Sequence, residues 1–535
     1  MARRLRHGEP RGGAFRLFQA AAPAAAYRLW RARLMRALAA PAPSGRLISL
    51  ILDGDAGDAA RTVASLAAQD HAAWELLLPA GAPDVPEEPR LRPLAQGAEP
   101  ADAALGSHVG RIAAGDTLAP GALARIAAAL SDDTDLLYTD EERMDGAGRP
   151  LAPLLKRAFD PDLAQCRDMI GRLALVRRDL APLGPLAVAL AHPGRVRHLA
   201  LPLYRRAAIP AVDAEAHRKA VQPLLDAAEP GAVAEVVGGL VRVRWPLPSP
   251  VPPVSVIVPT KDRVELLRPC VEAVLDRTQY PALELIVIDH ESTDPATCQF
   301  LDALRRRPGV RVLPHAGPFD YSAMNNLAAA SAAGEVLLFL NNDVEPLGPW
   351  WMNELVAQAV RPGVGAVGAK LLYPDRRIQH GGVVLGLGGG VAGHRYRLLP
   401  GDAPGPDGDA LCAQSPLAVT GACLAVTRAA FEAVGGFDAG VFPVAFNDVD
   451  LCLRLRERGL RSVWTPHAVL LHKESASLGR PGSAARRAQF AREEAAFRAR
   501  WGHLVGRDPS WHPLRSLEGD EGWLAWPPPA AAATR

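Results

Sequence analysis

Four polar clusters follow directly on apolar runs in the second half of the chain, and they contain side chains that could do chemistry. They are Pro259–Arg263, Asp289–Asp294, Asn341–Asp343 and Phe446–Arg454. In an open α/β sheet, ligands bind beyond the carboxyl ends of the strands. Carboxylates placed there can hold a divalent cation or take a proton from a hydroxyl group. We therefore expect these clusters to contribute to one site.

The apolar runs before these clusters predict the elements that position them. Val254–Val258 and Leu285–Ile288 are continuous apolar runs, and Leu266–Leu275 between them carries apolar residues at helical spacing. A strand, a helix and a strand in about 35 residues form a βαβ unit with a buried parallel sheet. The alternation continues through Val336–Leu340, so this half of the chain is predicted to be an α/β domain.

The first half of the chain repeats the pattern of the second. Arg46–Asp84 aligns with Pro253–Asp294, which places Ser49 on Ser255. Such a long period indicates a duplicated domain rather than a solenoid, whose repeats are about 20 to 50 residues long. The sequence therefore predicts two tandem copies of one mostly parallel, Rossmann-like α/β fold.

The two copies differ where chemistry is expected. A further aligned stretch places Asp116 on Asp343, whereas Ala80 stands at the position of Asp289. The first copy also lacks a counterpart of the acidic cluster Phe446–Arg454. We therefore expect the first copy to be degenerate and the second to be active.

Proline-rich stretches mark the boundaries between these parts, most clearly Trp245–Pro253 (WPLPSPVPP), which can continue neither a helix nor a central strand. Four segments are expected: a basic leader over 1–45, a degenerate domain over 46–245, a catalytic domain over 246–480, and a C-terminal helix with a Pro/Trp-rich tail over 481–535.

Composition excludes several classes of protein. The 535 residues contain 60 Lys and Arg against 58 Asp and Glu, a net charge of +2, which argues against a nucleic-acid partner. Six scattered cysteines without zinc spacing fit a reducing compartment. The sequence contains no uninterrupted run of 18 apolar residues, so it predicts no membrane-spanning helix. We expect a cytoplasmic protein.

The leader is the one strongly charged region, with ten arginines in the first 46 residues against the single acid Glu9. Aromatic and leucine residues alternate with the arginines, as in a basic amphipathic helix that docks at the inner face of the cytoplasmic membrane. The alternative is a helix that packs on the protein itself, and Pro23, which interrupts the pattern, favours that alternative.

The ordered motifs resemble those of the family 2 glycosyltransferases with the GT-A fold, specifically the rhamnosyltransferase-like enzymes of bacterial cell-surface polysaccharides. The resemblance runs from Val254 to about Leu514 and includes VSVIVPTKDR, ELIVIDHESTD, FDYSAMNN, QHGGVVLG, VTGACLAVTR, NDVDLCLRLRERG and LLHKESAS. It implies two tandem GT-A domains, the first of them degenerate.

The resemblance implies a nucleotide pocket and a metal site. Asp289 would bind the nucleobase or ribose, and Thr260 and Arg263 would line the same pocket; a turn or a helix cap is the alternative for each. Asn341, Asn342 and Asp343 occupy the position of the family's DxD signature. Asn341 and Asn342 would then contact the donor, while Asp343, with His472, would hold Mg²⁺ or Mn²⁺ on the diphosphate.

The resemblance also implies a catalytic base. Asp448 matches the second residue of the family's ED pair, which removes the proton from the acceptor hydroxyl, and Asn447 replaces the Glu. A helix cap is the alternative for Asp448, and we assign an ordinary ion pair with Arg454 to Asp450. Trp350 and Trp351 are candidate acceptor platforms, although core packing fits one of them better.

The predicted protein is an inverting, metal-dependent glycosyltransferase that moves a sugar from a UDP- or dTDP-linked donor to a hydroxyl of a glycan or lipid-linked acceptor. One alternative is a non-catalytic glycan- or nucleotide-binding scaffold of the same fold, because Asn replaces an acid in both acidic motifs. A nucleotidylyltransferase is a weaker alternative, since no glycine-rich loop follows the first strand of the second copy.

Overall fold

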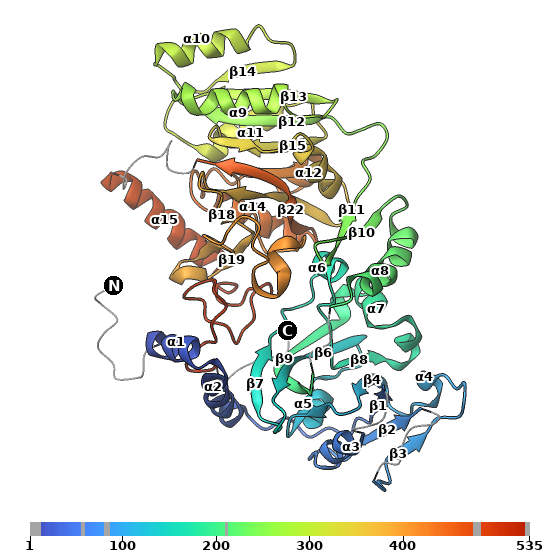
Figure 1. Cartoon of the computed structure of the whole chain (residues 1–535). Coiled ribbons are helices and arrows are strands. Elements are labelled where there is room, and N and C mark those ends of the chain that lie inside the picture. Colours follow the sequence, from blue (N-terminus) through green and yellow to red (C-terminus); the bar gives the residue numbers. More distant parts are fainter. Residues whose placement is uncertain (1–11, 55–58, 80–85, 209–211, 474–482, 530–535) are drawn as a thin grey trace. The chain divides into compact units, whose positions relative to one another are not determined.

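The computed structural model describes residues 12–54, 59–79, 86–208, 212–473 and 483–529, and its contacts divide the chain into two compact units (Figure 1). The first unit comprises Met1–Ala220, Trp511–Ser516 and Gly522–Arg535; the second comprises Val221–Ser510 and Leu517–Glu521. Each unit contains a nine-stranded mixed sheet. The predicted pair of α/β domains is therefore confirmed.

The sheet of the second unit is parallel at one end and mixed at the other. Its strands are β12 (Val254–Thr260), β13 (Leu283–Asp289), β14 (Val310–Pro314), β15 (Val336–Leu340), β16 (Val344–Pro346), β17 (Val364–Leu372), β18 (Ile378–His380), β21 (Cys423–Thr427) and β22 (Arg461–His472). Their order is β14-β13-β12-β15-β21-β17-β22-β16, with β18 paired to β17. The first four strands in this order are parallel, and the antiparallel strand β21 follows them.

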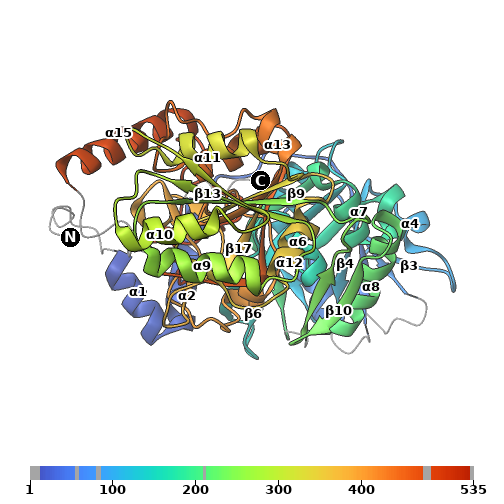
Figure 2. The same ribbon diagram turned by 90° about the horizontal axis from the view of Figure 1, so that it is seen from above.

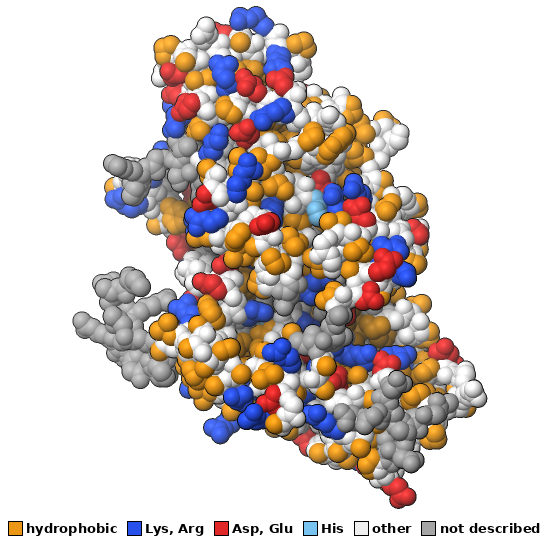
Figure 3. Space-filling view, in the orientation of Figure 1, with side chains coloured by type: hydrophobic (Ala, Val, Ile, Leu, Met, Phe, Trp, Pro, Cys, Tyr) orange, Lys and Arg blue, Asp and Glu red, His pale blue; other side chains and the backbone are white. Residues whose placement is uncertain are grey.

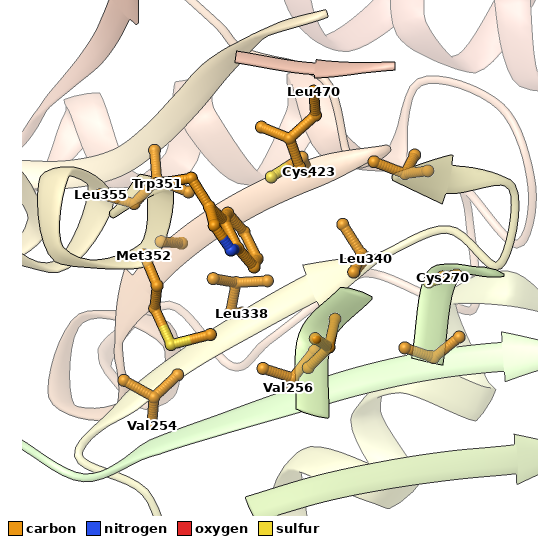
Figure 4. Packing of buried hydrophobic residues seen from close by; sticks show 14 of the residues in the cluster. Val254, Val256, Cys270, Leu338, Leu340, Trp351, Met352, Leu355, Cys423 and Leu470 are labelled. Atoms are coloured by element: carbon orange, nitrogen blue, oxygen red, sulfur yellow. The ribbon is translucent and has the colours of Figure 1, made fainter. Parts of the chain in front are cut away.

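Helices cover both faces of this sheet (Figure 2). They are α9 (Val264–Asp276), α10 (Pro295–Leu304), α11 (Tyr321–Ser331), α12 (Trp351–Ala359), α13 (Arg428–Ala433), α14 (Asn447–Glu457) and α15 (Ala484–Trp501). Because side chains alternate along a strand, Val256 packs in one core with α9, α10 and α12, whereas Ile257 packs in another with α11, α13 and α14. Figure 4 shows the first core, in which Trp351 and Met352 of α12 lie against Leu338.

The first unit repeats this topology. Its strands are β1 (Ile48–Asp53), β2 (Trp74–Leu78), β3 (Leu91–Pro93), β4 (His108–Ala113), β5 (Thr117–Leu118), β6 (Leu136–Met144), β7 (Pro150–Leu154), β8 (Ala174–Arg177) and β9 (Val196–Arg206). The order β3-β2-β1-β4-β8-β6-β9-β5, with β7 on β6, matches that of the second unit strand for strand. The helices of this half are α1 (Gly12–Ala21), α2 (Pro23–Ala37), α3 (Ala59–Ala67), α4 (Pro100–Ala103), α5 (Ala122–Ala129), α6 (Pro161–Cys166), α7 (Pro185–Ala191) and α8 (Ala214–Ala228), which crosses the boundary between the units.

One hydrogen-bond network is present in both units and shows which residues are equivalent. In the first unit, Ser49 Oγ donates to Glu75 Oε1 at 2.5 Å and accepts from the backbone N–H of Gly106 at 2.8 Å. In the second, Ser255 Oγ donates to Glu284, and it accepts from the N–H of Gly334 at 2.7 Å. The predicted alignment of Ser49 with Ser255 is thereby confirmed.

The equivalence of the two glycines corrects a second alignment. With Gly106 on Gly334, the residue on Asp343 is Gly115, and Asp116 falls one position later, on Val344. The turns agree, because Asp116 N bonds to Ala113 O as Val344 N bonds to Asn341 O. The expectation that Asp116 matches Asp343 was therefore wrong by one residue. Ala80, the other aligned position, lies outside the described residues.

The leader packs on the first unit. Tyr27, Trp30 and Leu34 of α2 are buried in its core, and Trp30 Nε1 donates to the carbonyl of Ala525 at 2.8 Å. Tyr27 and Arg31 both bond to the buried carboxylate of Glu142. The apolar face of α2 is thus used within the unit, which supports the alternative of a helix that packs on the protein.

Two further chain segments complete the description. Strands β10 (Val233–Val237) and β11 (Leu240–Arg244) form a hairpin of the second unit, and β19 (Val383–Leu385) and β20 (Ala392–His394) form another. Among the described residues, no helix is both long and apolar enough to span a membrane. Basic and acidic side chains are interspersed on the face shown in Figure 3.

Candidate active site

A cavity of about 720 Å³ in the second unit gathers most of the predicted site residues. It lies where β12 and β15 end and α14 begins, as expected for an open α/β sheet. The predicted residues that line it are Thr260, Arg263, Asn341, Asn342, Asp343, Asn447, Asp448 and His472. Three of the predicted residues, Asp289, Trp350 and Trp351, are not among its lining residues.

The end of β12 and the turn after β15 are joined across the cavity floor. Asn342 Nδ2 donates to Thr260 Oγ1 at 2.9 Å, and both side chains are buried. Arg263 begins α9 in a left-handed conformation, with φ of 59°, and its guanidinium pairs with Glu265 while staying partly exposed. Thr260 and Asn342 thus form a fixed floor, and Arg263 contributes a cation at the rim.

Asp289 ends β13 directly beside Thr260, but its carboxylate is used in a local turn. Its Oδ1 accepts from the N–H of Ser292 at 3.1 Å, which is the turn role considered as the alternative. The next residue, His290, lines the cavity instead. His290 Nδ1 lies 3.2 Å from His315 Nδ1, and burial lowers the pKa of His290.

Phe319, the first residue of the motif FDYSAMNN, is a second lining residue that was not among the predicted site residues. Its ring is 46% exposed and meets His290 edge to face, with centroids 5.8 Å apart. An exposed aromatic ring beside the ends of two strands can stack on a nucleobase. The position of His290 directly after a strand was a usable signal in the sequence, whereas nothing in the sequence indicated the exposure of Phe319.

Asp343 and His472 come together because β16 pairs with the end of β22. Val344 is the partner of His472 in this ladder, and the His472 Nε2 atom lies 3.2 Å from Asp343 Oδ1. Both residues are buried. The other ring nitrogen, Nδ1, lies 2.6 Å from Gln379 Oε1 of β18. Gln379 also lines the cavity and was not among the predicted site residues.

Asp448 opens α14 with both carboxylate oxygens oriented by backbone groups. Oδ2 accepts from the N–H of Gly421 at 2.7 Å, and Oδ1 accepts from the N–H of Val449 at 2.8 Å. The hydroxyl of Tyr321 donates to the carbonyl of Gly421 at 2.9 Å. Burial, together with the nearby Asp448, raises the pKa of Tyr321 well above its usual value, so the phenol stays protonated.

The other two residues in this acidic cluster have structural contacts. Asn447 is buried, and its Nδ2 donates to the carbonyl of Val444 at 3.1 Å. Asp450 accepts from Arg454 Nε at 2.7 Å, which confirms the predicted ion pair, and it also pairs with Arg500 at 2.8 Å. Asp448 is therefore the carboxylate of this helix that faces the cavity.

The two tryptophans do not form an acceptor platform at this cavity. Trp351 is 2% exposed, packs in the core under α9 and donates from Nε1 to Thr278 Oγ1 at 2.9 Å (Figure 4). The prediction that it binds acceptor was wrong, because α12 turns this side chain into the sheet. Trp350 is 60% exposed at the start of α12 but does not line the cavity.

The glycine-rich segment 381–393 forms most of the hairpin of β19 and β20. His380 and His394 flank it, and their Nδ1 atoms lie 2.7 Å apart. His394 is exposed and lines the cavity, whereas His380 is fully buried. Burial lowers the pKa of His380 well below its usual value, so this ring is neutral.

The first unit has a buried cluster of metal-type side chains, Asp140, His198 and His512, in which hydrogen bonds join both histidines to Asp140 and His198 Nδ1 has no hydrogen-bond partner among the described residues. Asp140 lies between His198 Nε2, at 2.9 Å, and His512 Nε2, at 2.8 Å. His512 Nδ1 accepts from the N–H of Leu514, so Nε2 of the neutral ring carries the proton and donates to Asp140. Burial would raise the pKa of Asp140, but the two histidines hold it well below its usual range. The cluster fastens the C-terminal segment to the first sheet.

Comparisons with known proteins bear on the family of this chain. Residues 255–382 match the description "Glycosyl transferase family 2". An "N-acetylglucosaminyl-diphospho-decaprenol L-rhamnosyltransferase" of Mycobacterium tuberculosis is 32% identical over 216 residues, which are 37% of this chain and 69% of that protein. The chain therefore belongs to glycosyl transferase family 2, as the motifs predicted.

Two longer relatives match both units. The "O-antigen biosynthesis protein RfbC" of Myxococcus xanthus is 38% identical over 522 residues, covering 88% of this chain and 40% of that protein. "Uncharacterized protein y4gI" of Sinorhizobium fredii is 35% identical over 541 residues, covering 90% of this chain and 59% of that protein. The chain thus spans about half the length of these relatives.

Proposed function

We propose that the second unit transfers a sugar from a nucleotide-diphosphate donor to a hydroxyl group of a glycan or lipid-linked acceptor, with inversion at the anomeric carbon. The observation that carries this proposal is the single cavity that brings Thr260, Asp343, Asp448 and His472 together. The names of the relatives, one an O-antigen biosynthesis protein and one a decaprenol-linked rhamnosyltransferase, support a surface polysaccharide as the product.

The donor atoms beside β16 fit a divalent cation. His472 Nδ1 faces the amide oxygen of Gln379, so Nε2 presents its lone pair on the side of Asp343 Oδ1. A nitrogen ligand next to a carboxylate suits Mn²⁺ better than Mg²⁺, which prefers oxygen. A bound Mn²⁺ or Mg²⁺ would neutralise charge on the departing diphosphate.

Asp448 is the proposed base. Two backbone N–H groups orient its carboxylate at the cavity, which places it to take the proton of the attacking hydroxyl. The hydroxyl oxygen forms the new glycosidic bond as the bond to the diphosphate breaks, and the proton goes to Asp448. Asn447 holds Val444 in place and takes no part in this proton transfer.

Thr260 and Asn342 would position the nucleotide part of the donor. Their mutual hydrogen bond fixes both side chains before binding, which reduces the entropy cost of binding. Beside Thr260 and Asn342, Phe319 and His290 supply an aromatic wall for the nucleobase of the donor. We assign contact with the nucleobase to this wall, because His290 and Phe319 line the cavity and Asp289 does not.

A panel of UDP-, dTDP- and GDP-sugars tests the proposal. We expect one donor, in the presence of Mn²⁺, to raise the melting temperature of the protein and to be hydrolysed slowly by it. Both effects should be lost in EDTA. NMR of the product formed with a simple glycoside acceptor should show the anomeric configuration opposite to that of the donor. If donors bind but none is hydrolysed or used for transfer, the non-catalytic scaffold is favoured instead. A product of retained configuration would exclude a single displacement.

A further inference from the structure

We propose that strand β18 fixes the tautomers of two cavity histidines in opposite senses: Gln379 makes Nε2 of His472 a lone-pair donor, and His380 makes Nε2 of His394 an N–H donor. Gln379 and His380 are consecutive residues of this strand. The role given to His472 rests on the proposed metal-dependent transfer, whereas the tautomers themselves do not.

The tautomer of His472 follows from a backbone carbonyl. Gln379 Nε2 lies 3.4 Å from the carbonyl oxygen of His472, which can only accept a hydrogen bond. The amide nitrogen must therefore be on that side, and the oxygen Oε1 must face His472 Nδ1, at 2.6 Å. Since Oε1 can only accept, Nδ1 carries the proton. In the neutral ring, Nε2 then has a lone pair, 3.2 Å from Asp343 Oδ1.

The tautomer of His394 follows from a backbone amide. The N–H of Thr420 points at His380 Nε2, at 3.4 Å, and an N–H group can only donate. His380 Nε2 is thus the acceptor, and in the neutral buried ring Nδ1 carries the proton. That proton is donated to His394 Nδ1, at 2.7 Å. His394 Nδ1 is therefore the acceptor, and its Nε2 is the N–H nitrogen.

The two rings consequently differ in what they can bind. A lone pair on His472 Nε2 next to a carboxylate attracts a cation, whereas it cannot donate a hydrogen bond to an oxygen atom of the substrate. An N–H on His394, a residue that lines the same cavity, binds an oxygen such as a sugar hydroxyl or a phosphate. Gln379 and His380 act as positioning residues, because each works through the histidine it holds.

Ring ¹⁵N NMR of the full chain with selectively labelled histidine tests the tautomers directly. The signals are assigned by their loss in His472→Asn and His394→Asn. With the pH raised until both rings are neutral, we expect a protonated Nδ1 and an unprotonated Nε2 for His472, and the reverse for His394. The same tautomer in both rings would overturn the proposal, whatever the activity of the protein.

Metal affinity tests the role of Gln379 apart from turnover. We expect Gln379→Leu to weaken Mn²⁺ binding by about 10- to 100-fold. The EPR signal of the free ion measures this binding. Gln379→Glu keeps an acceptor for Nδ1 and should retain most of the affinity. Gln358→Leu, which removes a buried amide bonded to Arg361 rather than to a cavity residue, is the matched control and should bind as the wild type does.

The outcomes separate this inference from the proposed function. If the wild type binds Mn²⁺ and Gln379→Leu binds it equally well, the positioning role of Gln379 is wrong, while metal-dependent transfer stands. If the wild type binds no Mn²⁺ with or without a nucleotide, the metal site is wrong, and the NMR result still decides the tautomers. Circular dichroism of each variant shows that it is folded.

Discussion

Asp448 and Asp450 lie two residues apart on α14, and replacing each by asparagine should give opposite phenotypes. Asp448 faces the cavity and accepts two backbone hydrogen bonds, from Gly421 and Val449. Asp450 is fully buried and accepts from Arg454, Arg500 and Trp501. The first substitution should abolish turnover, and the second should destabilise the unit.

The structure sets the magnitudes. In Asp448→Asn the amide cannot take the proton, so turnover should fall by at least about 10²- to 10⁴-fold. One of the two backbone N–H groups also loses its acceptor, which costs roughly 1–3 kcal/mol of stability. In Asp450→Asn the partly buried guanidinium groups of Arg454 and Arg500 lose the charge of a fully buried carboxylate. Arg500 keeps Asp438, and we expect a loss of about 1–3 kcal/mol. Its turnover, measured well below the unfolding midpoint, should stay within a few-fold of the wild type.

Three measurements check this pair of variants. Donor turnover gives the catalytic effect, urea unfolding followed by tryptophan fluorescence gives the stability, and donor competition binding shows whether the Asp448→Asn cavity is intact. If Asp448→Asn keeps its turnover within tenfold of the wild type, Asp448 is not the base. If Asp450→Asn loses turnover while keeping its stability, the two roles have been assigned the wrong way round.

Three further predictions concern the metal, the shared network and pH. Asp343→Asn should weaken Mn²⁺ binding at least roughly tenfold in calorimetric titration, because the site loses its carboxylate charge. An unchanged affinity would show that the cation does not bind at Asp343. Gly334→Ala places a Cβ 2.4 Å from the backbone nitrogen of Ser255 and should cost about 1–3 kcal/mol in urea unfolding, whereas Gly348→Ala, with open space around it, should be neutral. Burial lowers the pKa of His467 to about 4, below its value of about 6.5 in the unfolded chain. The unfolded state therefore takes up the proton first, and stability should fall by about 2 kcal/mol between pH 7 and 4.5. His467→Gln should flatten this slope, and an equally steep slope in that variant would assign it to other groups.

The sequence predicted the strands well, because they are buried on both faces. Each residue of β12 is buried, and such a run of apolar residues has one plausible structure once a helix follows it. Register could be read less reliably. Aligning Asp116 with Asp343 matched two acids, but the correct anchor was the glycine beside the strand, and a glycine gives a weak signal in a sequence. A single-residue slip was enough to place an acid at the metal position of the first unit, where the structure has Gly115.

Side-chain direction was the other quantity that the sequence could not provide. Trp350 and Trp351 are adjacent, yet one is exposed and the other is in the core, because they occupy different faces where α12 begins. Gln379 was visible in a motif, but its role depends on β18 pairing with β17 beside the end of β22, about 90 residues away in the chain. Contacts of that range follow from topology, which short motifs do not encode.

The duplicated fold shows that the framework and the site are separable. The first unit keeps the network of Ser49, Glu75 and Gly106 that ties neighbouring strands together, but Ala113-Ala114-Gly115 replaces the polar turn of the second unit. The position equivalent to His472 is Arg206, since Arg206 follows Arg205, the partner of Thr117, and would be the next residue of that ladder, opposite Asp116, as His472 is opposite Val344. Arg206 is bound to Glu141, and a guanidinium has no lone pair for a cation. A carboxylate restored at Gly115 would therefore lie beside a positive charge, so the loss of the site involves both sides of the sheet edge and no single substitution reverses it.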